Sequence, residues 1–288
     1  MRRPNFFIVG APRCGTTALW LYLKAHPEIF MSSQKELYYF DSDLHPEGST
    51  QPSLEQYLSN FASAGDRGLV GEATPSYLRS ERAPHAIKAF NPKARILIML
   101  RNPVDVMHSL HSLALYSLEP LTDFKAALEA DSKRRGPEHI GYRDFVDFPR
   151  QVKAYFATFG RTSVHVIIFD DLKRDPGSVY ENALRFLGAS VSFVPEFVVV
   201  SANANLRYSR LQKNVARPPE LLRGVTRALM PERLRSRVRR AILRANLVTQ
   251  PRAPMDPAFR RHLQKEFEPE IEKLSKLLDL DLTSWSVN

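Results

Sequence analysis

The sequence predicts an α/β fold, with one P-loop-like domain over residues 1–288 that has a central parallel sheet, flanking helices and a helical cap. Three observations predict it. Short apolar runs alternate with longer segments of helical periodicity, an order typical of strands joined by crossover helices. Phe6-Phe7-Ile8-Val9 is apolar throughout, as in a buried strand. A loop bounded by glycines follows this run and opens a helix.

The elements are expected in a regular order along the chain. Strands are predicted at 5–10, 28–31, 68–72, 95–100 and 164–169, and helices at 15–25, 53–62, 82–90, 103–118, 122–133, 142–158 and 176–187. The helix predicted over 176–187 has clear ends, because Asp175 is its N-cap, Pro176 its first residue and Gly188 the residue after it. The region 189–255 is expected to form the cap, and only 196–200 within it resembles a strand. A final helix is predicted near 257–279.

The loop after the first strand has the spacing of a phosphate-binding loop. Gly10 and Gly15 are separated by four residues, but Thr16-Thr17 stands where such a loop has Lys followed by Ser or Thr. Backbone N–H groups at the start of the helix would still bind an anion. Arg13 is the only side-chain cation of the loop. The loop therefore suits an anion with less charge than a nucleoside triphosphate.

Several segments resemble one family, the sulfotransferases that use 3′-phosphoadenylyl sulfate (PAPS). The stretch 10–19 is similar to their 5′-phosphosulfate loop, and Arg101 with Ser109, eight residues later, is similar to their 3′-phosphate signature. Two further stretches, 33–41 and 71–78, resemble the branch that modifies heparan sulfate, and the segment ending at Trp285 resembles the family's terminal segment. The matches follow the family's order and cover most of the chain.

The resemblance implies which residues bind PAPS. The 5′-phosphosulfate would be held by the loop, and the 3′-phosphate by the end of the fourth strand and the helix after it. A late loop near Arg210 is a looser match and would add one more contact. The implied cofactor-binding residues are Arg13, Cys14, Gly15, Thr16, Thr17, Arg101, Ser109 and Arg207.

The resemblance also implies a catalytic base. Attack by a hydroxyl needs a group that accepts its proton, and Glu36 stands where the similar branch has its base. Arg13 would act with it, by neutralising charge on the transferred and departing groups. His108 and His111 are rival bases. Cys14 is expected to be small rather than nucleophilic.

No metal is expected. A sulfuryl group carries one negative charge, so its transfer from PAPS, which leaves 3′,5′-bisphosphoadenosine (PAP), needs fewer cations than phosphoryl transfer with its metal ions. The chain has no Asp-rich segment and no His/Cys cluster, and its single cysteine excludes an intrachain disulfide.

Positive charge is concentrated late in the chain. Residues 201–265 hold 16 Lys or Arg but 3 Asp or Glu, while the whole chain has a net charge of +10. At the end of the basic segment 207–244, apolar residues from Leu234 to Ala245 fall at helical spacing with arginines around them. This pattern fits a packed helix with a solvated face or a peripheral contact of the segment with an anionic membrane. Nucleic acid is disfavoured, because no aromatic residues are interleaved with the arginines of 233–244. Since the first strand begins near Asn5, we expect a cytoplasmic protein.

The acceptor is not defined by the sequence. Hydroxyls of carbohydrates, glycolipids, small lipids and metabolites all fit, and the oligomeric state is equally open. Ala73 departs from the heparan-sulfate branch, which has a lysine at this place, and this argues against a glycosaminoglycan-like acceptor. The alternative to a sulfotransferase is a nucleotide-binding protein of the phosphate-loop type, kinase-like or recruited to membranes, and the missing loop lysine argues against the kinase.

Overall fold

The structure is a computed structural model that describes residues 2–45, 51–115, 119–134, 140–198, 204–206, 247–249 and 254–286. The chain forms two compact units. The first comprises Met1–Val106, Arg143–Val200 and Leu263–Asn288, and the second comprises Met107–Tyr142 and Ser201–His262. The single domain predicted over 1–288 stays a prediction.

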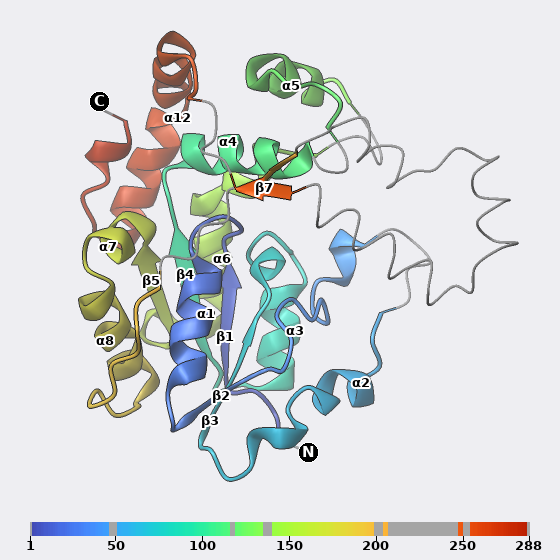
Figure 1. Cartoon of the computed structure of the whole chain (residues 1–288), viewed down its shortest axis with the longest axis vertical. Coiled ribbons are helices and arrows are strands. Elements are labelled where there is room, and N and C mark those ends of the chain that lie inside the picture. The colour runs from blue at the N-terminus through green and yellow to red at the C-terminus, as the bar shows by residue number, and fades with distance from the viewer. Residues whose placement is uncertain are drawn as a thin grey trace, which may run out of the picture. The chain divides into compact units, whose positions relative to one another are not determined.

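The first unit is built on a five-stranded parallel sheet with the strand order β2-β3-β1-β4-β5 (Figure 1). From β1 the chain moves to one side of the sheet for β2 and β3, and to the other side for β4 and β5. In open α/β sheets, ligands bind outside the carboxyl ends of the strands at such a switch point. The strands are β1 (Phe6–Gly10), β2 (Ile29–Met31), β3 (Leu69–Ala73), β4 (Arg95–Leu100) and β5 (Val164–Ile168).

The core of this unit lies on both faces of the sheet. All five residues of β1 and the last five of β4 are buried, as expected for strands covered on two sides. Gly71 in β3 packs so closely against β1 that an added Cβ would lie 2.1 Å from Cζ of Phe6. A glycine is therefore needed here to leave space for the phenylalanine ring.

Helices cover the two faces of the sheet. Figure 1 shows α1 on the near face and α6 on the far face. α3 packs against α6, and α7 packs against α8. The helices within the first unit are α1 (Thr16–Ala25), α2 (Leu54–Ser59), α3 (Ala83–Phe90), α6 (Phe148–Phe159), α7 (Phe169–Arg174) and α8 (Pro176–Leu187).

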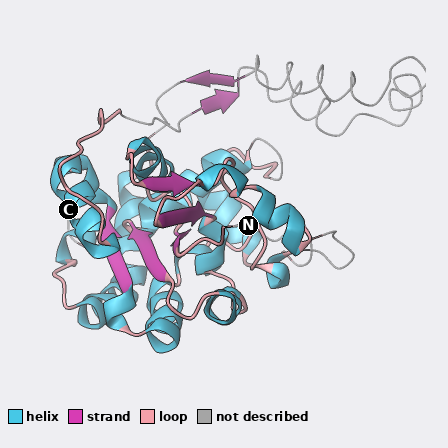
Figure 2. Ribbon diagram, turned by 90° about the horizontal axis from the view of Figure 1, so that it is seen from below, coloured by secondary structure: helices cyan, strands magenta, loops and turns pink. Residues whose placement is uncertain are grey.

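The second unit holds α5 (Phe124–Asp131) and a two-stranded antiparallel sheet of β6 (Ala204–Leu206) and β7 (Leu247–Thr249) (Figure 2). α4 (Pro103–Ala114) enters it from the first unit, and α12 (Pro257–Leu278) leaves it. Two carboxylates organise its loops. Asp131 accepts hydrogen bonds from the amides of residues 140–142, and Glu119 binds Arg134 through two contacts of 2.7 and 3.0 Å.

The predicted parallel sheet with flanking helices is confirmed, and all five strands lie where the sequence places them. The caps of α8 are also as predicted, since Asp175 accepts from Ser178 N at 2.9 Å and Gly188 has a φ of 71°. No helix among the described residues has both the length and the apolar character that crossing a bilayer requires.

Some predicted boundaries are wrong. The helix predicted over 142–158 begins at Phe148, because Pro149 fits the first turn but would break a helix that began earlier. The helix predicted over 103–118 ends at Ala114, and α7 was not predicted. Residues 196–198 form no strand, and most of the cap predicted over 189–255 lies outside the described residues.

We expect Gly71→Ala to lower the free energy of unfolding by about 1–3 kcal/mol, the usual cost of overpacking a core, as measured by urea denaturation. Gly68→Ala is the matched control, because nothing lies within 4 Å of a Cβ at that position. Equal stability of the two variants would contradict the close packing of β1 on β3.

Candidate active site

The glycine-bounded loop lies at the carboxyl end of β1. Ala11 N donates to Met99 O at 2.7 Å, which ties the loop to the neighbouring strand β4. Gly15 is the N-cap of α1 in a left-handed conformation, with a φ of 89°. A Cβ on Gly15 would lie 2.8 Å from the ring of Phe169, so both the backbone conformation and the close approach require glycine.

The start of α1 is suited to an anion. Its N-cap makes no side-chain hydrogen bond, and its first turn contains no acidic residue. The first N–H groups of a helix have no partner within the helix and carry the positive end of its dipole. Arg13, in the same loop, has a φ of 68°, and its positive charge acts on the thiol of the adjacent Cys14. The start of α1 therefore offers backbone donors to an anion, in a loop that carries the positive charge of Arg13.

Cys14 is fully buried within this loop. Burial raises the pKa of its thiol to about 12, although the positive charges of Arg101 and Arg13 act in the opposite direction. The thiol is therefore protonated at neutral pH and is not an available nucleophile.

Arg101 directly follows β4 and is largely buried, with 17% of its side chain exposed. Its guanidinium lies 4.9 Å from the ring centroid of Phe169, and Nη2 lies 3.5 Å from Oδ2 of Asp105. Nε is buried and has no hydrogen-bond partner among the described residues. A buried polar atom without a partner is costly, so this position favours binding of an acceptor group such as a phosphate oxygen.

The C-terminal segment around Trp285 is hydrogen-bonded to residues at the same edge of the sheet. Asn102 accepts a hydrogen bond from Val104 N at 3.0 Å and donates from Nδ2 to Trp285 O at 2.9 Å. The buried indole of Trp285 donates to Oδ2 of Asp170 at 3.3 Å. The residue after Arg101 is thus held from both sides, which limits the movement of the arginine's backbone.

Glu36 lies at the carboxyl end of β3, where its N–H donates to Ala73 O at 2.8 Å. Its φ is 67°, an unusual value for a non-glycine residue. Lys35 Nζ contacts Oε1 at 3.0 Å, and the Tyr38 hydroxyl donates to Oε2 at 2.5 Å. Burial tends to raise the pKa of this carboxyl, but the bonds from Tyr38 and Lys35 outweigh it and lower the pKa. Glu36 is therefore ionised at neutral pH, as a proton acceptor must be.

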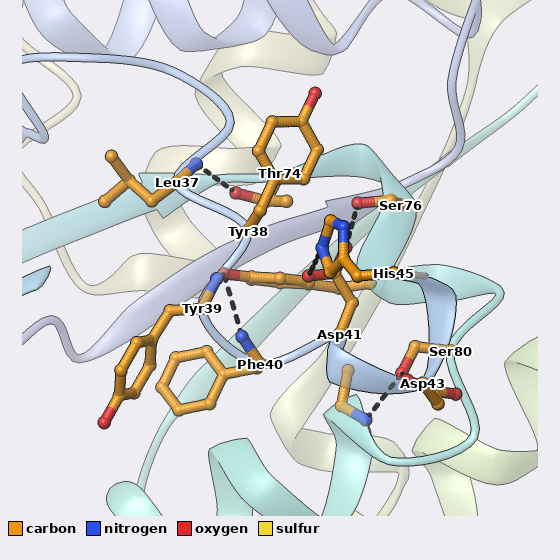
Figure 3. Close-up of polar contacts among 12 residues, drawn as sticks. Leu37, Tyr38, Tyr39, Phe40, Asp41, Asp43, His45, Thr74, Ser76 and Ser80 are labelled. Atoms are coloured by element: carbon orange, nitrogen blue, oxygen red, sulfur yellow. Dashed lines mark hydrogen bonds and ion pairs between the residues drawn. The ribbon is translucent and has the colours of Figure 1, made fainter. Parts of the chain in front are cut away.

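The segment after Glu36 is held by side chains of the β3 region (Figure 3). Leu37 N donates to Oγ1 of Thr74 at 3.0 Å, and Tyr39 N donates to the hydroxyl of Tyr77 at 3.0 Å. Asp41, at the end of the segment, accepts from the Ser76 hydroxyl at 2.5 Å. These bonds attach the segment to β3 and to the short 3₁₀ helix η3 (Pro75–Leu78) that follows it.

Sequence reasoning missed Glu72, which lies beneath this segment. Its carboxyl is fully buried and accepts hydrogen bonds from the hydroxyls of Tyr57, Tyr77 and Thr74, the last two at 2.7 and 2.8 Å. Burial raises its pKa to about 7 although all three hydroxyls act to lower it. A glutamate inside a predicted strand was the available signal, because a buried acid needs several donors.

The other predicted residues lie in the second unit or outside the described residues. Ser109 is buried in α4. His111 is buried, its Nε2 lies 2.9 Å from Leu121 O, and His108 packs on Phe124 with ring centroids 5.2 Å apart. Arg207 and the rest of 207–244 lie outside the described residues. The structure therefore brings together Glu36, the loop at 13–17 and Arg101 at neighbouring strand ends.

Among the described residues, no group of three or more His, Cys, Asp or Glu side chains is placed to hold a metal ion. That the reaction needs no metal stays a prediction.

Comparison with known proteins gives one family. The family model of the sulfotransferase domain matches residues 3–277. A crystal structure of a sulfotransferase from Alicyclobacillus acidocaldarius is 29% identical, covers 99% of each chain and has a TM-score of 0.74.

Two curated relatives are similar over part of the chain. The mouse bifunctional heparan sulfate N-deacetylase/N-sulfotransferase 1 is 26% identical over 66% of this chain and 22% of its own length. Human heparan sulfate glucosamine 3-O-sulfotransferase 6 is 30% identical over 43% of this chain and 34% of its own length. The chain spans about a fifth of the length of the first curated relatives that it matches, since the matched part is 21% of one relative and 22% of another.

We expect the stability contributed by Glu72 to depend on pH. Its pKa when folded, about 7, lies above the ordinary value of 4.5, so the folded state binds the proton more tightly. The free energy of unfolding should therefore fall as pH rises from about 4.5 to about 7. Urea denaturation at several pH values should show a flatter dependence for Glu72→Gln than for wild type.

The control for this measurement is Glu55→Gln, an exposed glutamate of α2, which should keep the wild-type pH dependence. A Glu72→Gln profile parallel to that of wild type would show that the buried carboxyl does not titrate in this range.

Proposed function

Since the chain belongs to the sulfotransferase family that uses PAPS, we propose that it transfers the sulfuryl group of PAPS to an acceptor hydroxyl at the carboxyl edge of the parallel sheet. The observation that carries the proposal is the meeting of three groups at adjacent strand ends. The uncapped start of α1 follows β1, Arg101 follows β4, and Glu36 is bonded to the end of β3. Two anion-binding positions and one ionised base thus share one edge.

The residues of this edge fit PAPS. The amides at the start of α1 and Arg13 would bind the 5′-phosphosulfate, with Cys14, Gly15, Thr16 and Thr17 as the rest of the loop. Arg101, whose buried Nε has no partner among the described residues, would bind the 3′-phosphate. For Ser109, which lies in the second unit, and for Arg207, which lies outside the described residues, the resemblance alone supports a role in cofactor binding. These assignments rest on the resemblance and, for Arg101, also on its buried Nε.

Charge and proton transfer define the chemistry. When bound, PAPS supplies an activated sulfuryl group of single negative charge. Glu36 would accept the proton of the acceptor hydroxyl as that oxygen bonds to sulfur and the bond from sulfur to the 5′-phosphate oxygen breaks. Arg13 and the loop amides would stabilise the charge that remains on the departing phosphate, so PAP is the second product.

The acceptor is proposed to be a hydroxyl of a carbohydrate, a glycolipid or a small lipid-like metabolite. Ala73 is fully buried and offers no cation beside Glu36. Without that cation, the site is less suited to a highly anionic glycosaminoglycan than the heparan-sulfate enzymes that the chain resembles. The segment 207–244, which carries the proposed membrane contact, lies outside the described residues.

The assignment of Arg101 is tested by PAP binding. Arg101→Ala should weaken binding by about 10- to 150-fold, which corresponds to the 1.5–3 kcal/mol of a charge-assisted hydrogen bond. Calorimetric titration with PAP in the presence of EDTA measures it, and ATP with magnesium should give no comparable binding to the wild type.

Arg95→Ala is the matched control, because this exposed arginine lies at the amino end of the same strand β4. Unchanged PAP affinity in Arg101→Ala, or loss of wild-type binding on adding EDTA, would contradict the proposed binding mode.

The role of Glu36 is tested by Glu36→Gln. The variant should keep PAP affinity but lose turnover by about 10²–10⁴-fold, the usual contribution of a general base. The measurement is transfer from PAPS to a panel of carbohydrate, glycolipid and lipid hydroxyls. Glu81→Gln, which alters an exposed carboxylate, is the control. Near-normal turnover of Glu36→Gln, with a large loss in His108→Ala or His111→Ala, would move the base to α4.

A further inference from the structure

We propose that Tyr38 is a positioning residue of the active site, whose phenol hydroxyl holds the carboxylate of Glu36 in place through a direct hydrogen bond. The inference rests on the proposed function, in which Glu36 is the base. It adds a residue of this chain that nothing in the family comparison assigns.

The contact itself is direct. The Tyr38 hydroxyl donates to Oε2 of Glu36 at 2.5 Å, while Lys35 Nζ contacts the other oxygen, Oε1, at 3.0 Å. Each oxygen of the carboxylate therefore has one donor, and the plane of the group is fixed by two contacts. A carboxylate has about four lone-pair sites, so each oxygen can still accept a further bond from an acceptor hydroxyl.

Backbone conformation brings the two side chains together. Glu36 has a φ of 67° and Tyr38 a φ of 51°, and non-glycine residues rarely adopt this left-handed region. Two such residues separated by one position are costly unless the surrounding structure holds them. Leu37 N, between them, is held by Oγ1 of Thr74 at 3.0 Å. The left-handed turn is thus stabilised at its centre, with the carboxylate and the phenol on either side.

The ring of Tyr38 is supported on one side. His45 packs against it edge to face, with ring centroids 5.7 Å apart and planes at 88°. His45 is itself bound to Asp41, whose Oδ1 lies 3.2 Å from Nε2 (Figure 3). The Asp41 side chain is 1% exposed and also accepts from Ser76, so it is an anchored support. Tyr38 is therefore held in place although 39% of it is exposed to solvent.

The groups around the pair favour an ionised Glu36 and a protonated Tyr38. Lys35 and the Tyr38 hydroxyl are the groups that lower the pKa of Glu36, against the effect of burial. Burial, the bond to Glu36 and the charges of Glu36 and Asp41 raise the pKa of Tyr38. The phenol thus stays protonated, and it can donate to Glu36 throughout the range in which the carboxylate ionises. His45, whose ring packs against that of Tyr38, is the residue that follows the short 3₁₀ helix η1 (Ser42–Leu44), and Asp41 is the residue that precedes this helix.

The test is a titration of the Glu36 carboxyl by NMR in protein labelled with ¹³C-glutamate and saturated with PAP. The resonance is assigned by its disappearance in Glu36→Gln. Tyr38→Phe should raise the pKa of Glu36, because the variant removes a donor to the ionised form and keeps the ring. Tyr39→Phe is the matched control, since it removes the neighbouring phenol, and it should leave the titration of Glu36 as in wild type.

The expected result is a titration of Glu36 that moves to higher pH in Tyr38→Phe and not in Tyr39→Phe. A Tyr38→Phe titration that coincides with the wild-type curve overturns the inference. Because this readout needs PAP but no acceptor and no turnover, it is separate from the test of the base. An active Glu36→Gln variant would refute the base assignment, while an unmoved titration would refute the role of Tyr38.

Discussion

The segment that carries Glu36 depends on one buried carboxyl group, that of Glu72. The hydroxyls of Tyr77 and Thr74 both donate to it, at 2.7 and 2.8 Å. A hydroxyl has one proton, so once that proton is committed to Glu72 its lone pairs must face other donors. Those donors are the amides of Leu37 and Tyr39, at 3.0 Å each. The carboxyl therefore sets the direction of two hydroxyls, and these hold the backbone on either side of Tyr38.

The position of the proposed site follows from the order of the strands. β1 lies between β3 and β4, so the loop after β1 has the end of β3 on one side and the end of β4 on the other. Glu36 reaches this edge through its bond to Ala73, and Arg101 reaches it by following Leu100 directly. Residues that lie far apart in the sequence thus become neighbours because their strands are neighbours. No loop has to be long to bring them together.

What could be predicted from the sequence was local. The strands were apolar runs, and the ends of α8 were marked by Asp175 and Gly188, whose effects reach only a few residues. The start of α6 was misplaced because the restriction imposed by Pro149 was overlooked. Glu72 was not predicted, because its partner Tyr57 comes from a different element. The contact of Tyr38 with Glu36 was also missed, since it requires left-handed backbone at two residues whose types do not favour it.

The burial of the Cys14 thiol also lowers its reactivity towards oxidants. The chain has a single cysteine, and it lies within the glycine-bounded loop that follows β1. Oxidants and electrophiles react with the thiolate, and a thiol that is fully buried with a pKa of about 12 supplies almost none at neutral pH. The thiol in this loop is therefore a poor target for such reagents while the chain is folded.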